Sequence, residues 1–332
     1  MRLFSFLILS VIMFYACDND LDIIEEPRDI PVVYGFLSLS DTAQYIRLER
    51  AFVDENISAL ELAMNPDSLY YPNAQVSLRR DASGELFDLE MVDGNLEGYV
   101  RDSGAFAQSP NYLYKIKSDD IDLRAGEMYS LVIQRTEDSE TIEAETRLIG
   151  PTEIKSPNSQ NAVILDFDYV DLNLFIWQAS EGASVHDLFF RFNYRERSPE
   201  TNNQFVSKSV LWKAGSNIEE EDVRVDYEFQ GLNFYTFLSG AIPVETDVQR
   251  RFENMDMIVV SGGTEILDFV NVSSANLGIT STQDVPSYTN IPEGRGIFSS
   301  RYTTELNTIT LSNQTIDSLV NGSLTSQLNF IN

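Results

Sequence analysis

The sequence predicts a mainly β protein, in which a β-sandwich is followed by a β-rich α+β unit with a large antiparallel sheet and two or three short helices. Two observations indicate this class. From Pro31 on, short runs of β-branched and aromatic residues recur at strand spacing, separated by turn residues. After Pro151 the alternating runs lengthen, and a few stretches change to helical spacing. We therefore expect residues 31–150 to form the sandwich and residues 151–332 to form the α+β unit.

The segment before the sandwich carries a targeting pattern. Arg2 precedes a short apolar run, Leu3–Tyr15, which ends at Ala16 and at Cys17, the only cysteine in the chain. The run is shorter than the about 20 residues of a transmembrane helix, and it has the size and leading charge of a secretory signal. A small residue directly before Cys17 suits cleavage there. We therefore interpret residues 1–16 as a lipoprotein signal peptide and Cys17 as the acylated residue.

Two alternatives to this interpretation stay open: a secreted protein with a cysteine inside its signal, and an uncleaved anchor. Phe14 and Tyr15 stand where a simple secretory peptide needs a small residue, which favours the lipoprotein signal. An acyl chain such as palmitate adds about 0.8 kcal/mol per buried methylene, and two or more chains hold stably. Acylated Cys17 would therefore attach the chain to outer-membrane lipid without a second anchor.

The acidic run Asp18–Glu26 has no periodicity, and we interpret residues 17–30 as a tether. In Bacteroidota lipoproteins, acidic residues directly after the acylated cysteine form the signal that sends lipoproteins to the cell surface, and CDNDLD resembles that pattern. The resemblance implies a lipid-anchored protein of the outer membrane that faces the cell surface. A merely solvated linker is the alternative.

The first strands expected in the sandwich are VVYGFLSL (32–39) and YIRLERAFV (45–53), and the second alternates polar and apolar residues. The run AGEMYSLVI is common in immunoglobulin-like modules: Gly126 turns the chain, while Tyr129, Leu131 and Ile133 share one face. An immunoglobulin-like β-sandwich is therefore expected. Its other elements are a helical stretch at 58–64 and strands at 74–80, 85–92, 112–118, 124–134 and 141–149.

The segment Ile149–Thr152 contains the Gly-Pro pair 150–151, which interrupts the strand pattern. We expect the boundary between the two units there. Beyond this segment, residues 162–180 are expected to form a hairpin. Residues 186–197 alternate so that three aromatic side chains share one face: Phe190, Phe192 and Tyr194. Further strands are expected at 207–212, 223–229, 255–262, 297–302 and 307–311. Helices are expected at 231–242, 264–277 and 315–320.

The charge balance excludes some classes of partner. The chain has 23 Lys and Arg against 52 Asp and Glu, a net charge of −29. Nucleic acids and anionic lipid headgroups need positive charge to displace their counterions, so neither is an expected partner. The chain is not expected to be disordered, because 43% of its residues are hydrophobic and 11% are aromatic.

Catalytic side chains are scarce. With Cys17 acylated no thiol remains, and His186 is the only histidine. His186 beside Asp187 could act as a general base, but a surface or edge histidine is the simpler interpretation, since no G-x-S-x-G elbow accompanies it. Acidic clusters at 119–122, 166–171 and 219–222 could ligate calcium, although solvated faces are the default. We therefore predict no enzymatic activity, no cofactor and no metal site.

The most distinctive stretch is YTNIPEGRGIFSSRY, residues 288–302. Its glycines allow a tight backbone, Phe298 can anchor it to a core, and two arginines stand out in an acidic protein. One interpretation is a partner-contact loop formed by Asn290, Gly294, Arg295, Gly296, Phe298 and Arg301. The other is a structural entry from a loop into a strand, with internal ion pairs.

Several segments together resemble a known family. The cysteine after the apolar run, VVYGFLSLSDTAQYIRLERAF, GLNFYTFLSGAI and YTNIPEGRGIFSSRY are similar to Bacteroidota outer-membrane lipoproteins that carry a domain of unknown function. Such proteins are often encoded beside TonB-dependent receptors, which implies a role with transporters. The family supplies no catalytic residues to carry over.

Three functions follow from these observations. The first is a lipid-anchored envelope protein that acts as a binding or accessory subunit, with a TonB-dependent outer-membrane transporter or another envelope protein as its partner. The second is a glycan-binding surface lipoprotein, for which Trp177 or Trp212 would have to form an exposed platform. The third and weakest is a carboxylate-dependent hydrolase, which would need two convergent acids in a cleft.

Overall fold

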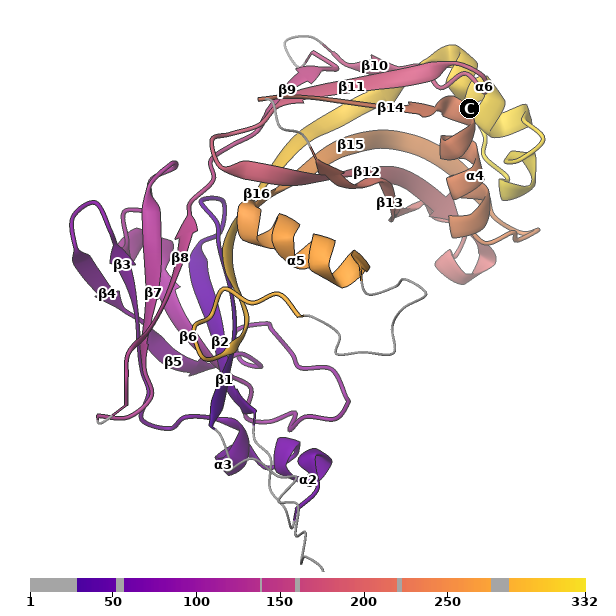
Figure 1. Cartoon of the computed structure of the whole chain (residues 1–332). Coiled ribbons are helices and arrows are strands. Elements are labelled where there is room, and N and C mark those ends of the chain that lie inside the picture. Colours follow the sequence, from indigo (N-terminus) through magenta and orange to yellow (C-terminus); the bar gives the residue numbers. More distant parts are fainter. Residues whose placement is uncertain (1–28, 52–56, 138, 159–161, 220–222, 276–286) are drawn as a thin grey trace, which may run out of the picture.

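The computed structural model describes residues 29–51, 57–137, 139–158, 162–219, 223–275 and 287–332. An N-terminal and a C-terminal β unit lie next to each other, and one large sheet runs through both (Figure 1). The expected fold class is confirmed: the chain is mainly β, with few short helices. None of the helices in these ranges is long and apolar enough to cross a bilayer.

The N-terminal unit is a β-sandwich with two layers. The first layer belongs to the large sheet and has the order β1 (Ile30–Leu37), β2 (Ala43–Ala51), β6 (Tyr112–Lys117) and β5 (Glu90–Asp93). The second layer has the order β4 (Glu85–Asp88), β3 (Gln75–Arg80), β7 (Met128–Gln134) and β8 (Ile142–Arg147). Alternate apolar side chains of both layers meet in one buried core that includes Val33, Ile46, Leu78, Leu131 and Ala144.

The run expected as one strand at 85–92 is divided between the two layers. β4 pairs with β3 in the second layer, whereas β5 pairs with β6 in the first. Leu89 lies between them in the core, and its N–H donates to the Val76 carbonyl at 2.9 Å. Alternation could not reveal this change of sheet, because each half keeps the period of a strand.

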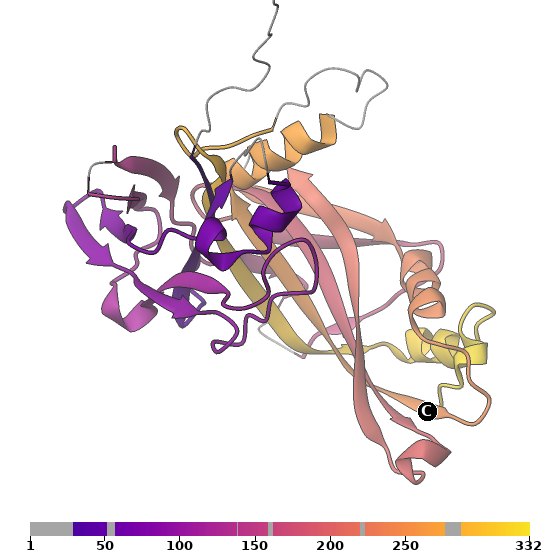
Figure 2. The same cartoon turned by 90° about the horizontal axis from the view of Figure 1, so that it is seen from below.

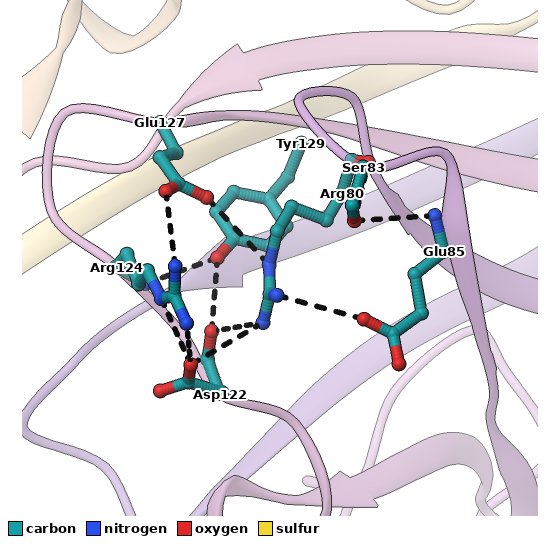
Figure 3. A network of polar contacts seen from close by, with 7 residues as sticks. All are labelled: Arg80, Ser83, Glu85, Asp122, Arg124, Glu127 and Tyr129. Carbon is teal, nitrogen blue, oxygen red and sulfur yellow. Dashed lines mark hydrogen bonds and ion pairs between the residues drawn. The ribbon is translucent and has the colours of Figure 1, made fainter.

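A tyrosine corner fixes the turn that leads into β7 (Figure 3). The Tyr129 hydroxyl accepts a hydrogen bond from the Arg124 N–H at 3.0 Å and donates to the Asp122 carbonyl oxygen at 3.4 Å. Gly126 has a φ of +81°, a conformation that glycine adopts without strain. Such a corner is typical of immunoglobulin-like sandwiches, and it accounts physically for the AGEMYSLVI run.

The Arg80 side chain lies beside this corner and faces three carboxylates (Figure 3). The distances from its guanidinium are 3.5 Å to Glu85, 3.6 Å to Glu127 and 3.8 Å to Asp122. Arg80 is buried, and a buried guanidinium is tolerated only with such compensation. At least one acid of the cluster at 119–122 therefore serves as an ion-pair partner.

The C-terminal unit packs long antiparallel strands of the large sheet against a smaller sheet. The long strands have the order β13 (Val206–Glu219), β12 (Ala183–Arg197), β15 (Gln249–Gly263) and β16 (Arg295–Leu311). The smaller sheet has the order β14 (Arg224–Gln230), β11 (Leu172–Gln178) and β9 (Glu153–Ser156). The core between them is rich in aromatic side chains, among them Phe167, Phe175, Trp177, Phe190, Phe192, Tyr194, Phe229 and Phe234. The face expected for β12 is confirmed.

Short helices flank the sheets of the two units. They are α2 (Ala59–Ala63), α3 (Pro66–Leu69), α4 (Gly231–Ala241), α5 (Thr264–Ala275) and α6 (Asn313–Asn321), with single turns η1 (Ser118–Asp120), η2 (Pro199–Thr201) and η3 (Ser326–Leu328). In Figure 1, α2 and α3 lie at the lower end of the sandwich, and α4 and α6 lie beside the C-terminus. α5 contacts the large sheet on the face opposite to β11 and β14.

β16 joins the two units. It pairs antiparallel with β15 and, through its first residues, parallel with β1, where Val33 lies opposite Gly296. The large sheet is therefore mixed, although the pairs that join β13, β12, β15 and β16 are antiparallel as expected. The strands expected at 297–302 and 307–311 are one continuous strand. The division of the chain into domains at Gly150 stays a prediction.

The prediction of a hairpin at 162–180 is wrong. β10 (Ile164–Leu165) pairs in parallel with β16, while β11 pairs with β9 and β14. The Asp166 carboxylate accepts hydrogen bonds from the hydroxyls of Ser312 and Thr315, at the start of α6. These distant partners hold the segment away from β11, and the local alternation of polar and apolar residues gives no sign of them.

Candidate ligand-binding site

The loop before β16 is tied to the sandwich by the residues expected to contact a partner. The Asn290 side chain donates from Nδ2 to the Phe298 carbonyl at 2.7 Å, and its Oδ1 accepts from the Phe298 N–H at 2.9 Å. The Phe298 ring is buried in the sandwich core. A Cβ at Gly294 would lie 2.8 Å from the Pro31 carbonyl oxygen. Asn290, Gly294 and Phe298 therefore have clear structural roles.

The two arginines of this loop do not share a site. Arg295 is exposed and lines a polar depression of about 650 Å³ with Asp29, Arg135 and Glu293. Arg301 lies further along β16 and forms an ion pair with Asp41 at 3.2 Å. Strands rise about 3.3 Å per residue, so six residues separate these side chains by roughly 20 Å along β16. A partner-contact role for this loop stays a prediction, and Cys17 lies outside the described residues.

A cavity of about 630 Å³ lies on the outer face of β1 and β2, under α2. Its apolar wall is formed by Val32, Ala51, Ala59, Leu60, Ala63, Leu69 and Phe106, and its charged wall by Arg47, Glu49, Arg50 and Arg101. β2 alternates as the sequence predicts: Ile46 and Leu48 enter the sandwich core, and Arg47 and Glu49 take the other face. Residues 94–111 fold back over that face, so it is not a simple solvent surface.

The charged wall is centred on the carboxylate of Glu49, a residue that is only 6% exposed. Glu49 Oε1 accepts from Arg47 Nη1 at 2.9 Å and lies 2.8 Å from Arg101 Nη2. Asn111 Oδ1 accepts a second hydrogen bond from Arg47 Nη1 at 2.8 Å. Two guanidinium groups thus share one carboxylate, which leaves a net positive charge on this part of the wall.

Two aromatic side chains contact the Arg101 guanidinium. Arg101 Nη1 donates to the Tyr70 hydroxyl at 3.1 Å, and its guanidinium lies 4.9 Å from the centre of the Phe106 ring. Burial raises the pKa of Tyr70, so its hydroxyl stays protonated at neutral pH. These contacts hold Arg101 in one orientation at the cavity wall.

The composition of the cavity favours one class of ligand. A mostly apolar lining with a few fixed polar groups is typical of small-molecule sites, and guanidinium groups match carboxylates and phosphates. The cavity therefore suits an anion with an apolar body. The sequence contains two signals for this site, the charged pair within YIRLERAFV and the helical stretch expected at 58–64, but Arg101 comes from the separate segment 94–111.

His186 has a structural setting. It is buried on β12, a strand with neighbours on both sides, so the expectation of a surface or edge histidine is wrong. Its Nδ1 lies 2.9 Å from the Ser261 hydroxyl, which lies 2.7 Å from the Thr152 hydroxyl. Burial lowers the pKa of His186 to about 4, so the ring is neutral at pH 7. The Asp187 carboxylate pairs instead with Lys213 at 2.8 Å.

The other candidate sites gain no geometric support. Within the described residues, no three His, Cys, Asp or Glu side chains are placed to hold a metal ion. Part of the cluster at 219–222 lies outside those residues. Trp177 is buried, and Trp212 packs on the Phe229 and Phe237 rings, so the two tryptophans form no exposed platform.

The comparisons with known proteins give the family. The chain belongs to the family described as "Domain of unknown function (DUF4249)", whose model matches residues 18–306. The expected domain of unknown function is thus confirmed. No curated protein matches the chain in sequence.

Among solved structures, the chain is similar at 12% identity to the C-terminal globular domain of an oligosaccharyltransferase from Pyrococcus abyssi. The alignment covers 60% of this chain and 38% of that chain, with a TM-score of 0.21. The match thus spans well under half of that chain's length.

Proposed function

We propose that this member of the DUF4249 family is a lipid-anchored protein of the outer membrane, facing the cell surface, that acts as a binding or accessory subunit of an outer-membrane transporter. Acylated Cys17 attaches it to outer-membrane lipid. The lipoprotein pattern at Ala16 and Cys17 and the resemblance to Bacteroidota lipoproteins encoded beside TonB-dependent receptors support this role.

The observation that carries the binding role is the cavity on β1 and β2. Its apolar lining and its Arg47–Glu49–Arg101 wall form a preorganised receptor for an amphipathic anion. The charged groups already hold one another in place, so little conformational entropy is lost when a ligand binds.

The position of the cavity suits an anchored protein. Its lining begins at Val32, close to the start of the described chain at Asp29. A fully extended chain spans at most about 3.4 Å per residue, so the segment from Cys17 to Asp29 can reach roughly 40 Å. An anchor at Cys17 would therefore hold the start of the sandwich, beside the cavity, within roughly 40 Å of the membrane surface.

Two variants test this proposal. Cys17→Ser should release the protein from the membrane fraction and abolish its association with the transporter. Ala63→Trp should fill the cavity and weaken binding of an amphipathic anion such as dodecanoate, while Ala82→Trp, at an exposed turn, should leave binding unchanged. Membrane partitioning of Cys17→Ser, or equal dodecanoate binding by both tryptophan variants, would contradict the proposal.

The other two functions are glycan binding by the tryptophans and hydrolysis by a pair of carboxylates. No specific observation favours either at those side chains. The described tryptophans pack against the core, and the described acids form no paired constellation in the cavity.

A further inference from the structure

A cluster of three arginines surrounds one aromatic ring at the end of the C-terminal sheet. The guanidinium carbons of Arg197 and Arg251 lie 5.0 Å from the centre of the Phe205 ring, and that of Arg195 lies 5.8 Å from it. The ring comes just before β13, while the arginines come from β12 and β15. We refer to Arg195, Arg197, Arg251 and Phe205 as the arginine cluster.

The pairing of the strands forces these charges together. Arg195 lies directly opposite Arg251 in the register of β12 and β15, and Arg197 lies opposite Gln249. The neighbouring residues Tyr194 and Glu196 are buried, so Arg195 and Arg197, which alternate with them, take the outer face of the sheet. Like charges that face each other across two strands destabilise a sheet.

In the described part of the chain, the facing charges are not joined to a carboxylate by a direct ion pair. Within the described residues, none of the three arginines forms an ion pair with a carboxylate, and Arg197 bonds instead to the Gln249 side chain through Nε at 3.0 Å. The adjacent Arg250 shows the contrast, because it points inward and pairs with Glu196 at 2.7 Å. The chain has 52 acidic residues, yet none in its described part forms an ion pair with this cluster.

A polar pocket of about 500 Å³ adjoins the cluster. Arg197 and Gln249 form the shared wall, and Asn203, Thr246 and Asp247 complete the polar lining. Amide and hydroxyl groups can donate and accept hydrogen bonds, and Asp247 can only accept them when ionised. A bare anion inside the pocket would be repelled by Asp247, whereas hydroxyl groups would be bound by it.

The geometry points to an acidic oligosaccharide as the ligand of this end of the molecule. Its carboxylates or sulfates would bind the arginine cluster, since guanidinium forks match such groups, and its hydroxyls would bind the adjoining pocket. The turn between β12 and β13 lies far from α2 and α3 in both views (Figure 1, Figure 2). An anchor near α2 would therefore leave the cluster free to meet an extracellular glycan, although the binding itself does not depend on the anchor.

Binding of oligogalacturonate to the full chain tests the inference, with methyl-esterified oligogalacturonate as the uncharged control. We expect salt-sensitive binding of the acid that weakens at least tenfold in the double variant Arg195→Gln, Arg251→Gln. The matched control is Arg224→Gln, which removes an exposed arginine paired with Asp226 on another sheet and should bind like the wild type. Both glutamine changes remove facing charges, so the double variant should unfold at the wild-type temperature or slightly above it.

Three results would overturn the inference. One is the absence of binding to oligogalacturonate and to dextran sulfate alike. Another is equal affinity of the wild type and the double variant. The third is tighter binding of poly-glutamate than of either acidic glycan with the same dependence on Arg195 and Arg251, which would assign the cluster to an acidic polypeptide.

Discussion

Gly296 of β16 lies so close to Val33 of β1 that a Cβ at position 296 would be 1.9 Å from the Val33 carbonyl oxygen. Gly296 also has a φ of +103°, which side-chain-bearing residues rarely adopt. This contact is where the C-terminal strand joins the N-terminal sandwich. The continuity of the large sheet therefore depends on a residue without a side chain.

Gly296→Ala should destabilise the protein by about 3 kcal/mol, since backbone strain adds to overpacking. Thermal unfolding measures the effect. Gly240→Ala in α4 is the control: nothing lies within 4 Å of the position that its methyl group would take, so alanine should leave stability equal or slightly raised there. Equal unfolding temperatures for the two variants would show that β16 and β1 are not in this register.

Tyr129→Phe should cost about 1–2 kcal/mol, because it removes the buried hydroxyl that accepts a hydrogen bond from the Arg124 N–H and donates one to the Asp122 carbonyl oxygen. Urea unfolding of the variant gives the value. Tyr34→Phe is a suitable comparison, as Tyr34 is exposed on β1, and it should change stability very little. A Tyr129→Phe protein as stable as the wild type would show that the tyrosine corner does not stabilise the sandwich.

Glu49→Ala should destabilise the protein by about 3 kcal/mol, because two guanidinium groups then face each other at a buried site without their carboxylate. Asp226→Ala breaks an exposed pair with Arg224 and should cost less than about 1 kcal/mol. The two unfolding free energies are compared at pH 7 and low salt. If the Glu49 variant were the more stable of the two, the charged wall of the cavity would not be organised around Glu49.

His186 should make stability depend on pH. Burial lowers its pKa in the folded chain to about 4, against about 6.5 in an unfolded chain. The unfolded state therefore takes up a proton first as the pH falls, so the stabilisation is complete above about pH 6.5 and is lost towards pH 4. The loss is about 3 kcal/mol over this range.

The difference between wild type and His186→Gln isolates this effect from the many carboxylates that also titrate. Unfolding free energies of both proteins at pH 7 and pH 4.5 should show a smaller pH dependence in the variant. Identical pH dependence would mean that His186 is accessible to protons in the folded state.

Local patterns predicted much of the fold. The alternation in β12 placed Phe190, Phe192 and Tyr194 in the core, and the AGEMYSLVI run indicated the sandwich with its buried Tyr129. The parallel pairing of β16 with β1 was not predictable, because it joins segments more than 250 residues apart and leaves no local period.

The candidate sites depend on the same distant pairings. Arg47 and Glu49 are visible in the sequence as a charged pair on a strand, but Arg101 reaches them only when residues 94–111 fold over β2. The alternation of β12 places Arg195 and Arg197 on one face, yet only the register with β15 places Arg251 opposite Arg195. The sequence of each segment shows which charged side chains it carries, but it does not show that the segments bring these side chains together in space.

We propose that the chain works as an anchored subunit of an outer-membrane transporter. The most direct measurement is the native mass and composition of the particle that a mild detergent releases from outer membranes. We expect one copy of this chain with one outer-membrane transporter in a fixed ratio, and loss of that particle in Cys17→Ser. Release of the wild-type protein as a lone monomer would contradict the claim.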